Sequence, residues 1–300
     1  FVYTPHRYHH FLSLDSRVRC RSIRSGLHLL LSVLIGQRGL ANAFLDFQPT
    51  LRYRFLAKIS GARVISGLVN QRRWISIFDT HPVRPLVANR LQCESNLDVL
   101  RRLGCNATLG LASFKRLAQS FRKPPFLSFD SYIVVHAGSR WMFKSLGESQ
   151  WLDLVKGLTE KYDATIVLTG GDSSQEVELA SRLASWPDVV SCVGETSSDE
   201  LIAIIRDSIG FIGVDTFASH LAAFLDVPGV VVFGPTNRAV WGPHRSTRMI
   251  AYTINPNDYP CMPCNQDGCG GSKVSQCLRD AQSEEILGVF QSALSNCREV

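Results

Sequence analysis

The stretch FIGVDTFASHLAAFLDVPGVVVFGPTN, residues 211–237, decides the fold. It opens with an apolar run at Phe211–Val214, continues with helical periodicity over Thr216–Leu225, and ends with a second apolar run at Gly229–Phe233. Neither run alternates apolar with polar residues, which is typical of parallel strands buried on both faces. A buried strand, a helix and another buried strand form the repeating unit of a doubly wound sheet.

The same alternation extends back to about residue 132. Apolar runs predict strands at Tyr132–His136, Thr165–Thr169 and Val189–Val193. Helical spacing of apolar residues predicts a helix over Glu148–Tyr162. The residues that this helix is expected to bury are Trp151, Leu154, Val155 and Leu158.

Two serine–glutamate pairs have the spacing of helix N-terminal capping boxes. Ser173 with Glu176 predicts a helix that runs to about Ala184. Ser197 with Glu200 predicts another, whose buried stripe is Leu201, Ile202, Ile204 and Ile205.

The first half of the chain is less regular. It predicts a strand at Ala43–Phe47, a basic amphipathic helix at Leu51–Ile59 and a helix at Ser95–Leu103. Phe121–Phe129, which contains two adjacent prolines, is expected to link two domains. The candidate core residues of the last helix are Leu97, Leu100 and Leu103.

The composition is that of a globular protein. Of 300 residues, 45% are hydrophobic and 19% are charged, and the mean hydropathy is +0.03, which excludes a disordered or collagen-like chain. The longest apolar run, Leu29–Ile35, is far shorter than the roughly 20 residues of a membrane-spanning helix. No signal-peptide pattern opens the chain, so we expect a cytoplasmic protein.

Charge divides the chain into two unequal halves. Residues 1–125 carry 20 Lys and Arg against five Asp and Glu, a charge of +15, whereas residues 126–300 carry −9. We therefore expect two domains, 1–125 and 126–300, that meet different partners. The basic half is suited to a phosphorylated glycolipid, a membrane surface or a nucleic acid. Alternatively, the arginines merely reflect a GC-rich genome.

The residues that follow the predicted strands are small or polar. Gly138 and Ser139 follow the first strand of the second half, and Asp215 and Thr216 follow the strand at Phe211–Val214. Ligands of an open parallel sheet bind at this edge. Neither G-x-G-x-x-G nor a P-loop motif follows any strand, so a dinucleotide oxidoreductase and a P-loop NTPase are disfavoured.

The segment from Asp215 to His220 is the most specific local signal. Thr216 is placed to cap a helix, and His220, four residues later, should lie on the same side of that helix. A carboxylate, a hydroxyl, helix N-terminal amides and an imidazole would together suit a sugar diphosphate. The alternative is an ordinary helix cap with a packed histidine.

Two further residues are candidates for contact with the same ligand. Lys144, in the loop after the first strand, could neutralise a departing diphosphate, or it could be a solvated loop lysine. Glu176 could hold sugar or ribose hydroxyls, although its place in a capping box already accounts for it.

Four cysteines lie close together near the C-terminus. Cys261, Cys264, Cys269 and Cys277 fall within 17 residues and begin with a C-x-x-C pair. This pattern fits a structural zinc or iron site, and it fits at least as well reduced thiols in a loop that folds without metal.

The second half resembles glycosyltransferase family 9, the ADP-heptose:lipopolysaccharide heptosyltransferases. The similar segments are VVHAGSRWMFK (134–144), IVLTGGDSSQE (166–176), GETSSDELIAII (194–205), the stretch at 211–237, and WGPH (241–244). The FK pair at 143–144 is similar to the heptosyltransferase III branch. The first half is similar more weakly, through FLDFQPTLRYRFLAKISGARVISG (44–67) and ESNLDVLRRLG (94–104).

The resemblance implies an α/β fold of the GT-B type, with two Rossmann-like doubly wound domains facing a cleft. It implies ADP-heptose as donor, a lipopolysaccharide inner-core acceptor, and inverting transfer that needs no metal. By position, Lys144 would stabilise the departing diphosphate, with Gly138, Ser139 and Glu176 on the nucleotide side. Asp215, Thr216 and His220 would contact the heptose and phosphates.

Two departures from the family pattern affect this interpretation. Phe217 stands where the family usually has Gly, which could change the sugar accepted. The family's N-terminal Gly-Asp turn, whose Asp is the expected general base, is not found, so we expect an incomplete N-terminal domain. Asp15 and Asp46 are the only carboxylates before residue 79, and Asp46 better fits acceptor contact or loop ordering.

The sequence thus predicts a heptosyltransferase at the cytoplasmic face of the inner membrane, in peripheral contact with it and without a nucleic-acid partner. Two alternatives stay open. One is a GT-B transferase that uses another nucleotide sugar. The other is a non-catalytic donor-binding module that lacks the N-terminal base.

Overall fold

The computed structural model shows two compact units, Phe1–Leu109 and Gly110–Val300. Each unit has its own parallel sheet. Among the described residues, no helix has both the length and the apolar character that crossing a bilayer requires. The structure describes residues 2–5, 20–23, 43–47, 51–59, 61–69, 73–84, 89–244 and 248–296.

The boundary between the units lies at residue 109 rather than at residue 125, because helix α5 (Leu111–Ala118) packs on the second unit. Phe114 of α5 meets Phe224 edge to face, with ring centroids 6.3 Å apart. Arg206 also donates hydrogen bonds to the carbonyl oxygens of Ala118 and Phe121.

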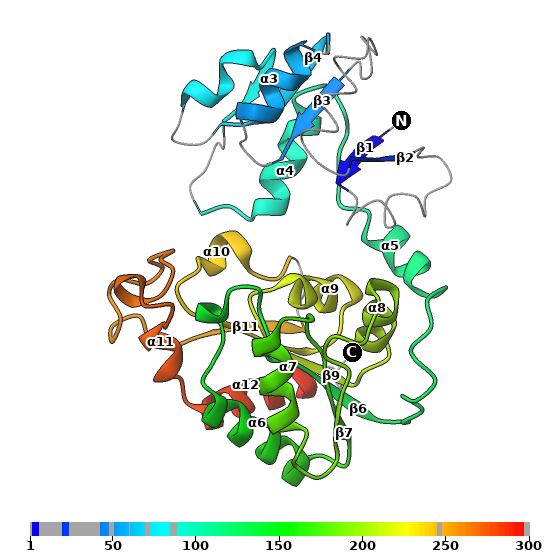
Figure 1. The fold of residues 1–300 in the computed structure, drawn as a ribbon, viewed down its shortest axis with the longest axis vertical. Helices are drawn as coiled ribbons and strands as arrows, with labels where there is room; N and C mark the ends of the chain where they lie inside the picture. The colour runs from blue at the N-terminus through cyan, green and yellow to red at the C-terminus, as the bar shows by residue number, and fades with distance from the viewer. Residues whose placement is uncertain are drawn as a thin grey trace. The chain divides into compact units, whose positions relative to one another are not determined.

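The second unit contains a six-stranded parallel sheet in the order β11-β10-β9-β6-β7-β8 (Figure 1). The chain builds β6, β7 and β8 outward on one side and then returns to build β9, β10 and β11 on the other. The order therefore reverses between β6 and β9, which is the switch point of a Rossmann sheet. The strands are β6 (Tyr132–His136), β7 (Thr165–Leu168), β8 (Val189–Ser191), β9 (Gly210–Val214), β10 (Gly229–Phe233) and β11 (Met249–Thr253).

Every helix and strand that the sequence predicted in this unit is present, with ends that differ by a few residues at most. The helices after α5 are α6 (Glu148–Lys161), α7 (Ser174–Leu183), α8 (Ser198–Arg206), α9 (Phe217–Leu225), α10 (Arg238–Trp241), α11 (Gln276–Arg279) and α12 (Ser283–Ser295). Short 3-10 turns, η2 (Met142–Lys144) and η3 (Cys269–Gly271), interrupt two of the loops.

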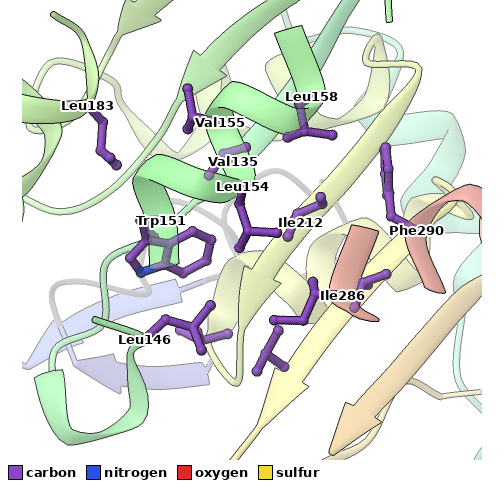
Figure 2. Packing of buried hydrophobic residues seen from close by; sticks show 14 of the residues in the cluster. Val135, Leu146, Trp151, Leu154, Val155, Leu158, Leu183, Ile212, Ile286 and Phe290 are labelled. Atoms are coloured by element: carbon purple, nitrogen blue, oxygen red, sulfur yellow. The ribbon is translucent and has the colours of Figure 1, made fainter. Parts of the chain in front are cut away.

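Helices α6 and α12 pack on one face of the sheet (Figure 2). The predicted stripe of α6 is fully buried, and its Trp151 and Leu154 pack in one cluster with Ile212 of β9 and Phe290 of α12. Alternate strand residues point to the other face, where α8 and α9 lie against each other. Because helices cover the sheet, ligands have access to it only at its edges.

The first unit contains a three-stranded parallel sheet, ordered β3-β4-β5, and a parallel pair of strands, β1-β2. The predicted strand and basic helix are present as β3 and α3, and a 3-10 helix, η1, precedes β5. The bounds are β1 (Val2–Pro5), β2 (Cys20–Ile23), β3 (Ala43–Asp46), α3 (Leu51–Ile59), β4 (Val64–Leu68), η1 (Arg73–Phe78), β5 (His81–Val83) and α4 (Gln92–Arg101).

Helix α4 differs from the expected Ser95–Leu103 in its position and in part of its core. Leu97 is buried as predicted, but Leu100 and Leu103 are half-buried, and Val99 is fully buried instead. Val99 packs against Leu68 of β4 and against β5. The contact with these strands, which the helical spacing did not reveal, sets the rotation of the helix.

Candidate active site

The predicted site residues follow the carboxyl ends of neighbouring strands of the second unit. Gly138 and Ser139 follow β6, Glu176 lies beyond β7, and Asp215 follows β9. Thr236, which is not one of the predicted site residues, follows β10 at the same edge. The strand order reverses between β6 and β9, and open α/β sheets bind ligands at the carboxyl ends of the strands beside such a switch point. The topology thus brings residues from distant parts of the sequence to one edge.

Lys144 and Asp215 form an ion pair between the loops that follow β6 and β9. The Nζ of Lys144 lies 2.8 Å from Oδ2 of Asp215, and the two side chains are only 13% and 6% exposed. The same Nζ lies 5.1 Å from the ring centroid of Trp141, which stacks on Phe143. An ammonium group has three N–H donors, so pairing with Asp215 leaves donors for a ligand.

His220 lies within electrostatic range of this ion pair. Burial lowers the pKa of His220; the negative charge of Asp215 opposes that effect and the positive charge of Lys144 adds to it. The imidazole is therefore neutral near pH 7 and can donate one hydrogen bond and accept another. The structure brings Lys144, Asp215 and His220 together, as the sequence predicted.

Thr216 is at the N-cap of α9, but its side chain does not cap the helix as expected. The hydroxyl of Ser219 instead donates to the carbonyl oxygen of Thr216 and accepts from its N–H group. The Oγ1 atoms of Thr216 and Thr236 are buried and make no hydrogen bond in the part of the chain that the structure describes. Buried polar atoms are normally satisfied, so two such hydroxyls after adjacent strands suit a polar ligand.

Glu176 is buried, and its carboxylate turns back toward the loop after β7. Its Oε1 accepts the N–H of Gly171 at 3.1 Å, and its Oε2 accepts the hydroxyl of Ser173 at 2.7 Å. A Cβ at Gly138 would collide with the Glu176 side chain, so only glycine fits there. The carboxylate therefore holds the loop after β7, in part through its predicted partner Ser173, and the Glu176 side chain packs against Gly138 of the loop after β6, which the sequence did not predict.

His136, the last residue of β6, lies near Glu176. Its Nδ1 is 2.9 Å from Oγ1 of Thr169. Burial lowers the pKa of His136 to about 4, against the opposing charge of Glu176, so the ring is neutral. A cavity of about 10 Å³ beside Glu176 and Thr169 has room for about one water molecule.

Ser139 and Ser145 hold the loop that carries Lys144. Ser139 Oγ accepts the N–H of Trp141 at 3.3 Å. Ser145 donates to the carbonyl oxygen of Ala137 at 2.7 Å and accepts the indole N–H of Trp151 at 3.0 Å. Because Trp151 is fixed in the core, this chain of hydrogen bonds fixes the loop relative to the sheet.

The first unit has a buried charge cluster centred on Arg54 of α3. Arg54 is fully buried and donates to Asp46 at 2.7 Å, to Asp79 and to the carbonyl oxygen of Leu68 at 2.7 Å. Burial raises the pKa of Asp79 to about 6, although Arg54 opposes that shift. Asp46 thus orders the loops of this unit, one of its two expected roles.

The four-cysteine loop lies between β11 and α12. Its thiols are free, and Cys277 is buried with its pKa raised to about 11, chiefly by burial and further by the neighbouring Cys269, Cys264 and Cys261. Within the described ranges, no three potential ligands are arranged to hold a metal ion. The expected metal site, made of Cys261, Cys264, Cys269 and Cys277, therefore does not fit this arrangement.

The architecture and this edge of the sheet define a class of protein. The GT-B fold is confirmed by E. coli heptosyltransferase WaaC with ADP, which aligns with a TM-score of 0.73 and 17% identity over 97% of this chain and 89% of that chain. E. coli ADP-heptose lps heptosyltransferase II aligns with a TM-score of 0.70 and 15% identity over 99% and 89%.

Sequence comparison identifies the family within that class. Residues 37–274 match the profile of glycosyltransferase family 9 (heptosyltransferase), so the chain belongs to this family. Lipopolysaccharide heptosyltransferase 3 of Escherichia coli is 30% identical over 223 residues, which are 69% of this chain and 63% of that protein. Lipopolysaccharide heptosyltransferase 1 of Pseudomonas aeruginosa is 30% identical over 138 residues, 46% and 37% of the two chains. The matched segments span less than two thirds of either relative.

Proposed function

We propose that this protein transfers heptose from ADP-heptose to the inner core of lipopolysaccharide at the cytoplasmic face of the inner membrane. The observation that carries the proposal is the Lys144–Asp215 ion pair beside neutral His220 at the switch point. Membership of glycosyltransferase family 9 supports the reaction class.

In the proposed reaction, an acceptor hydroxyl oxygen attacks the anomeric carbon of the heptose, and the bond from that carbon to the diphosphate breaks. Attack from the opposite side inverts the configuration. Lys144 donates hydrogen bonds to the diphosphate, whose negative charge grows as it leaves. Positive charge from Lys144 and from the N-terminal end of α9 lies where a metal ion would otherwise be needed.

The remaining site residues hold the donor in this proposal. Asp215 and His220 contact heptose hydroxyls, and the buried Thr216 hydroxyl contacts a phosphate or sugar oxygen. Gly138 and Ser139 bring backbone close to the phosphates. Glu176, through the loops that it connects, positions the nucleotide.

Two observations favour alternatives to this proposal. Phe217 is 56% exposed at the first residue of α9, next to Thr216, which favours a different donor sugar. Among the described residues, Asp46 and Asp79 both bind Arg54, which favours a donor-binding module; Asp15 lies outside the described residues.

The test is ADP release by the purified chain with ADP-heptose and a lipopolysaccharide core acceptor, with and without EDTA. We expect turnover that EDTA leaves unchanged within twofold. If the chain binds ADP-heptose but releases no ADP, it is a non-catalytic donor-binding module. If it releases nucleotide only from a different nucleotide sugar, that sugar is its donor. Loss of turnover in EDTA would contradict metal-independent transfer.

A further inference from the structure

Helix α3 of the first unit buries Leu56 and Ala57 and exposes Arg52 and Lys58, as an amphipathic helix does, but it also buries a charge and exposes large apolar side chains. Its Arg54 is fully buried, whereas Phe55 and Ile59 are 47% and 46% exposed. A surface helix normally buries its apolar side chains and exposes its charges. The exposed side of α3 is therefore suited to contact with a partner that covers apolar side chains.

The buried charge cluster fixes this orientation. Arg54 is held by Asp46, Asp79 and the carbonyl oxygen of Leu68. If α3 rotated to hide Phe55, these contacts would break and leave buried charges without partners. The exposed aromatic side chain is thus a consequence of how the helix is anchored.

Apolar exposure continues from α3 onto η1. Trp74 and Ile77 of η1 are 55% and 67% exposed. Phe55 and Phe78 connect the two elements, with ring centroids 5.5 Å apart. We call this surface the α3–η1 face; its exposed apolar residues are Phe55, Ile59, Trp74 and Ile77.

The charges around the α3–η1 face have one sign. Among the side chains described between residues 43 and 84, the exposed charged ones are Arg52, Lys58, Arg63 and Arg84. Both carboxylates in that interval, Asp46 and Asp79, point inward to Arg54. The exposed charges described in this stretch are therefore all positive, and the part-buried Glu94 and Asp98 of α4 are paired with Arg90 and Arg101.

We propose that the α3–η1 face docks on the surface of an anionic phospholipid bilayer. Trp and Tyr favour the membrane–water interface, aliphatic tips reach the acyl boundary, and Lys and Arg bind anionic headgroups. A second copy of the chain is a poorer partner, because two cationic faces would repel each other. The inference rests on the proposed function in one respect, since a membrane-anchored acceptor requires an enzyme that reaches the membrane.

The test is co-sedimentation of the full chain with vesicles of phosphatidylcholine alone or mixed with phosphatidylglycerol. We expect binding to the mixed vesicles that weakens with salt. Trp74→Ser combined with Ile77→Ser should reduce the partition coefficient at least tenfold. Lys58→Gln should reduce it about fivefold, the effect of one cation near an anionic surface.

The second unit offers a matched control. Trp186 is also exposed and has Lys156 over its ring at 5.9 Å, so it pairs an aromatic ring with a cation as the docking surface does. Trp186→Ser and Lys156→Gln should bind vesicles as the unmodified chain does.

Three results would overturn the inference. One is equal vesicle binding by the Trp74 variant and the unmodified chain. Another is a dimer of the unmodified chain in gel filtration together with a monomer of the Trp74 variant, which would mean that the face binds a second copy of the chain. The third is a melting temperature lowered by Trp74→Ser, which would mean that the chain itself covers the face. ADP release with a delipidated acceptor, measured in parallel, reports separately on the proposed function and should be the same in the Trp74 variant.

Discussion

At the scale of single residues, the site is electrically balanced before a ligand arrives. Lys144 and Asp215 neutralise each other at 2.8 Å, and His220 is uncharged near pH 7. A diphosphate that enters this site must compete with Asp215 for the Lys144 ammonium. In the proposed reaction the diphosphate gains charge as it leaves, so we expect Lys144 to bind it more tightly at that point and to speed the reaction rather than only to strengthen donor binding.

Lys144→Ala should therefore lower kcat about a hundred- to a thousandfold, the usual effect of losing one donor to a developing charge. The KM for the donor should change much less. Steady-state ADP release measures both, and Lys156→Ala, an exposed lysine of α6, is the control. Equal changes in kcat and KM would make Lys144 a binding residue only.

Gly138→Ala should disrupt the site because the added Cβ collides with Glu176. The displaced carboxylate loses its contacts with the loop after β7, so we expect weaker donor binding and a lower melting temperature. Gly288→Ala is the control, since that glycine has open space around it inside α12 and should stabilise the protein by about 0.5–1 kcal/mol. Calorimetry of donor binding and thermal unfolding measure both effects; an unchanged Gly138→Ala variant would contradict the contact.

At the scale of elements, the two best-defined N-termini of the second unit differ in how they are capped. Ser197 and Glu200 form a complete reciprocal capping box on α8. On α9 the Thr216 hydroxyl is left without a partner in the described part of the chain. Removal of a hydroxyl that caps a helix should lower the stability of the fold, whereas removal of a hydroxyl that contacts only a ligand should lower the affinity for that ligand.

Thr216→Val should leave thermal stability unchanged or raise it, because the substitution removes a buried hydroxyl that has no partner. The same substitution should weaken donor binding about tenfold, the worth of one hydrogen bond. Ser197→Ala should do the reverse, with a loss of about 1 kcal/mol of stability and unchanged donor affinity. A stability loss in Thr216→Val equal to that of Ser197→Ala would show that Thr216 caps α9 after all.

At the scale of the whole molecule, the two units contain buried groups with opposite pH responses. The pKa of His136 in the second unit is lowered to about 4 by burial. The pKa of Asp79 in the first unit is raised to about 6 by burial. Both groups prefer their neutral form when folded, but one is neutral at high pH and the other at low pH.

Acidification from pH 6.5 to 4 should thus destabilise the second unit by up to about 3 kcal/mol, because the unfolded His136 takes up a proton that the folded one does not. Over pH 4 to 6 the first unit should behave oppositely and lose stability as the pH rises, because the folded Asp79 keeps its proton longer. Hydrogen exchange of each unit across this range measures the difference. His136→Gln and Asp79→Asn should each remove the pH dependence of their own unit only; parallel behaviour of both units would contradict the assignment.

The sequence predicted correctly the features that depend on neighbouring residues, and it missed those that depend on contacts between residues distant in the chain. The strand at Gly229–Phe233 and the helix at Leu51–Ile59 are found with the predicted ends, because apolar periodicity and caps act locally. The sequence predicted the wrong bounds and in part the wrong core residues for helix α4, because Val99 is buried by strands that are distant in the sequence. The Arg54 cluster was missed for the same reason, since its carboxylates lie eight and 25 residues away along the chain.

The sequence by itself determined the alternation of strands and helices, the family and the residue types at the strand ends, because each depends on neighbouring positions. Only the tertiary structure decided which of those residues meet. The Lys144–Asp215 pair joins positions 71 residues apart, and it forms because β6 and β9 are neighbours in the sheet though not in the chain. It also showed that Glu176 packs against Gly138 of the loop after β6 and that the Thr216 hydroxyl makes no hydrogen bond within the described residues, since such contacts depend on distance in space.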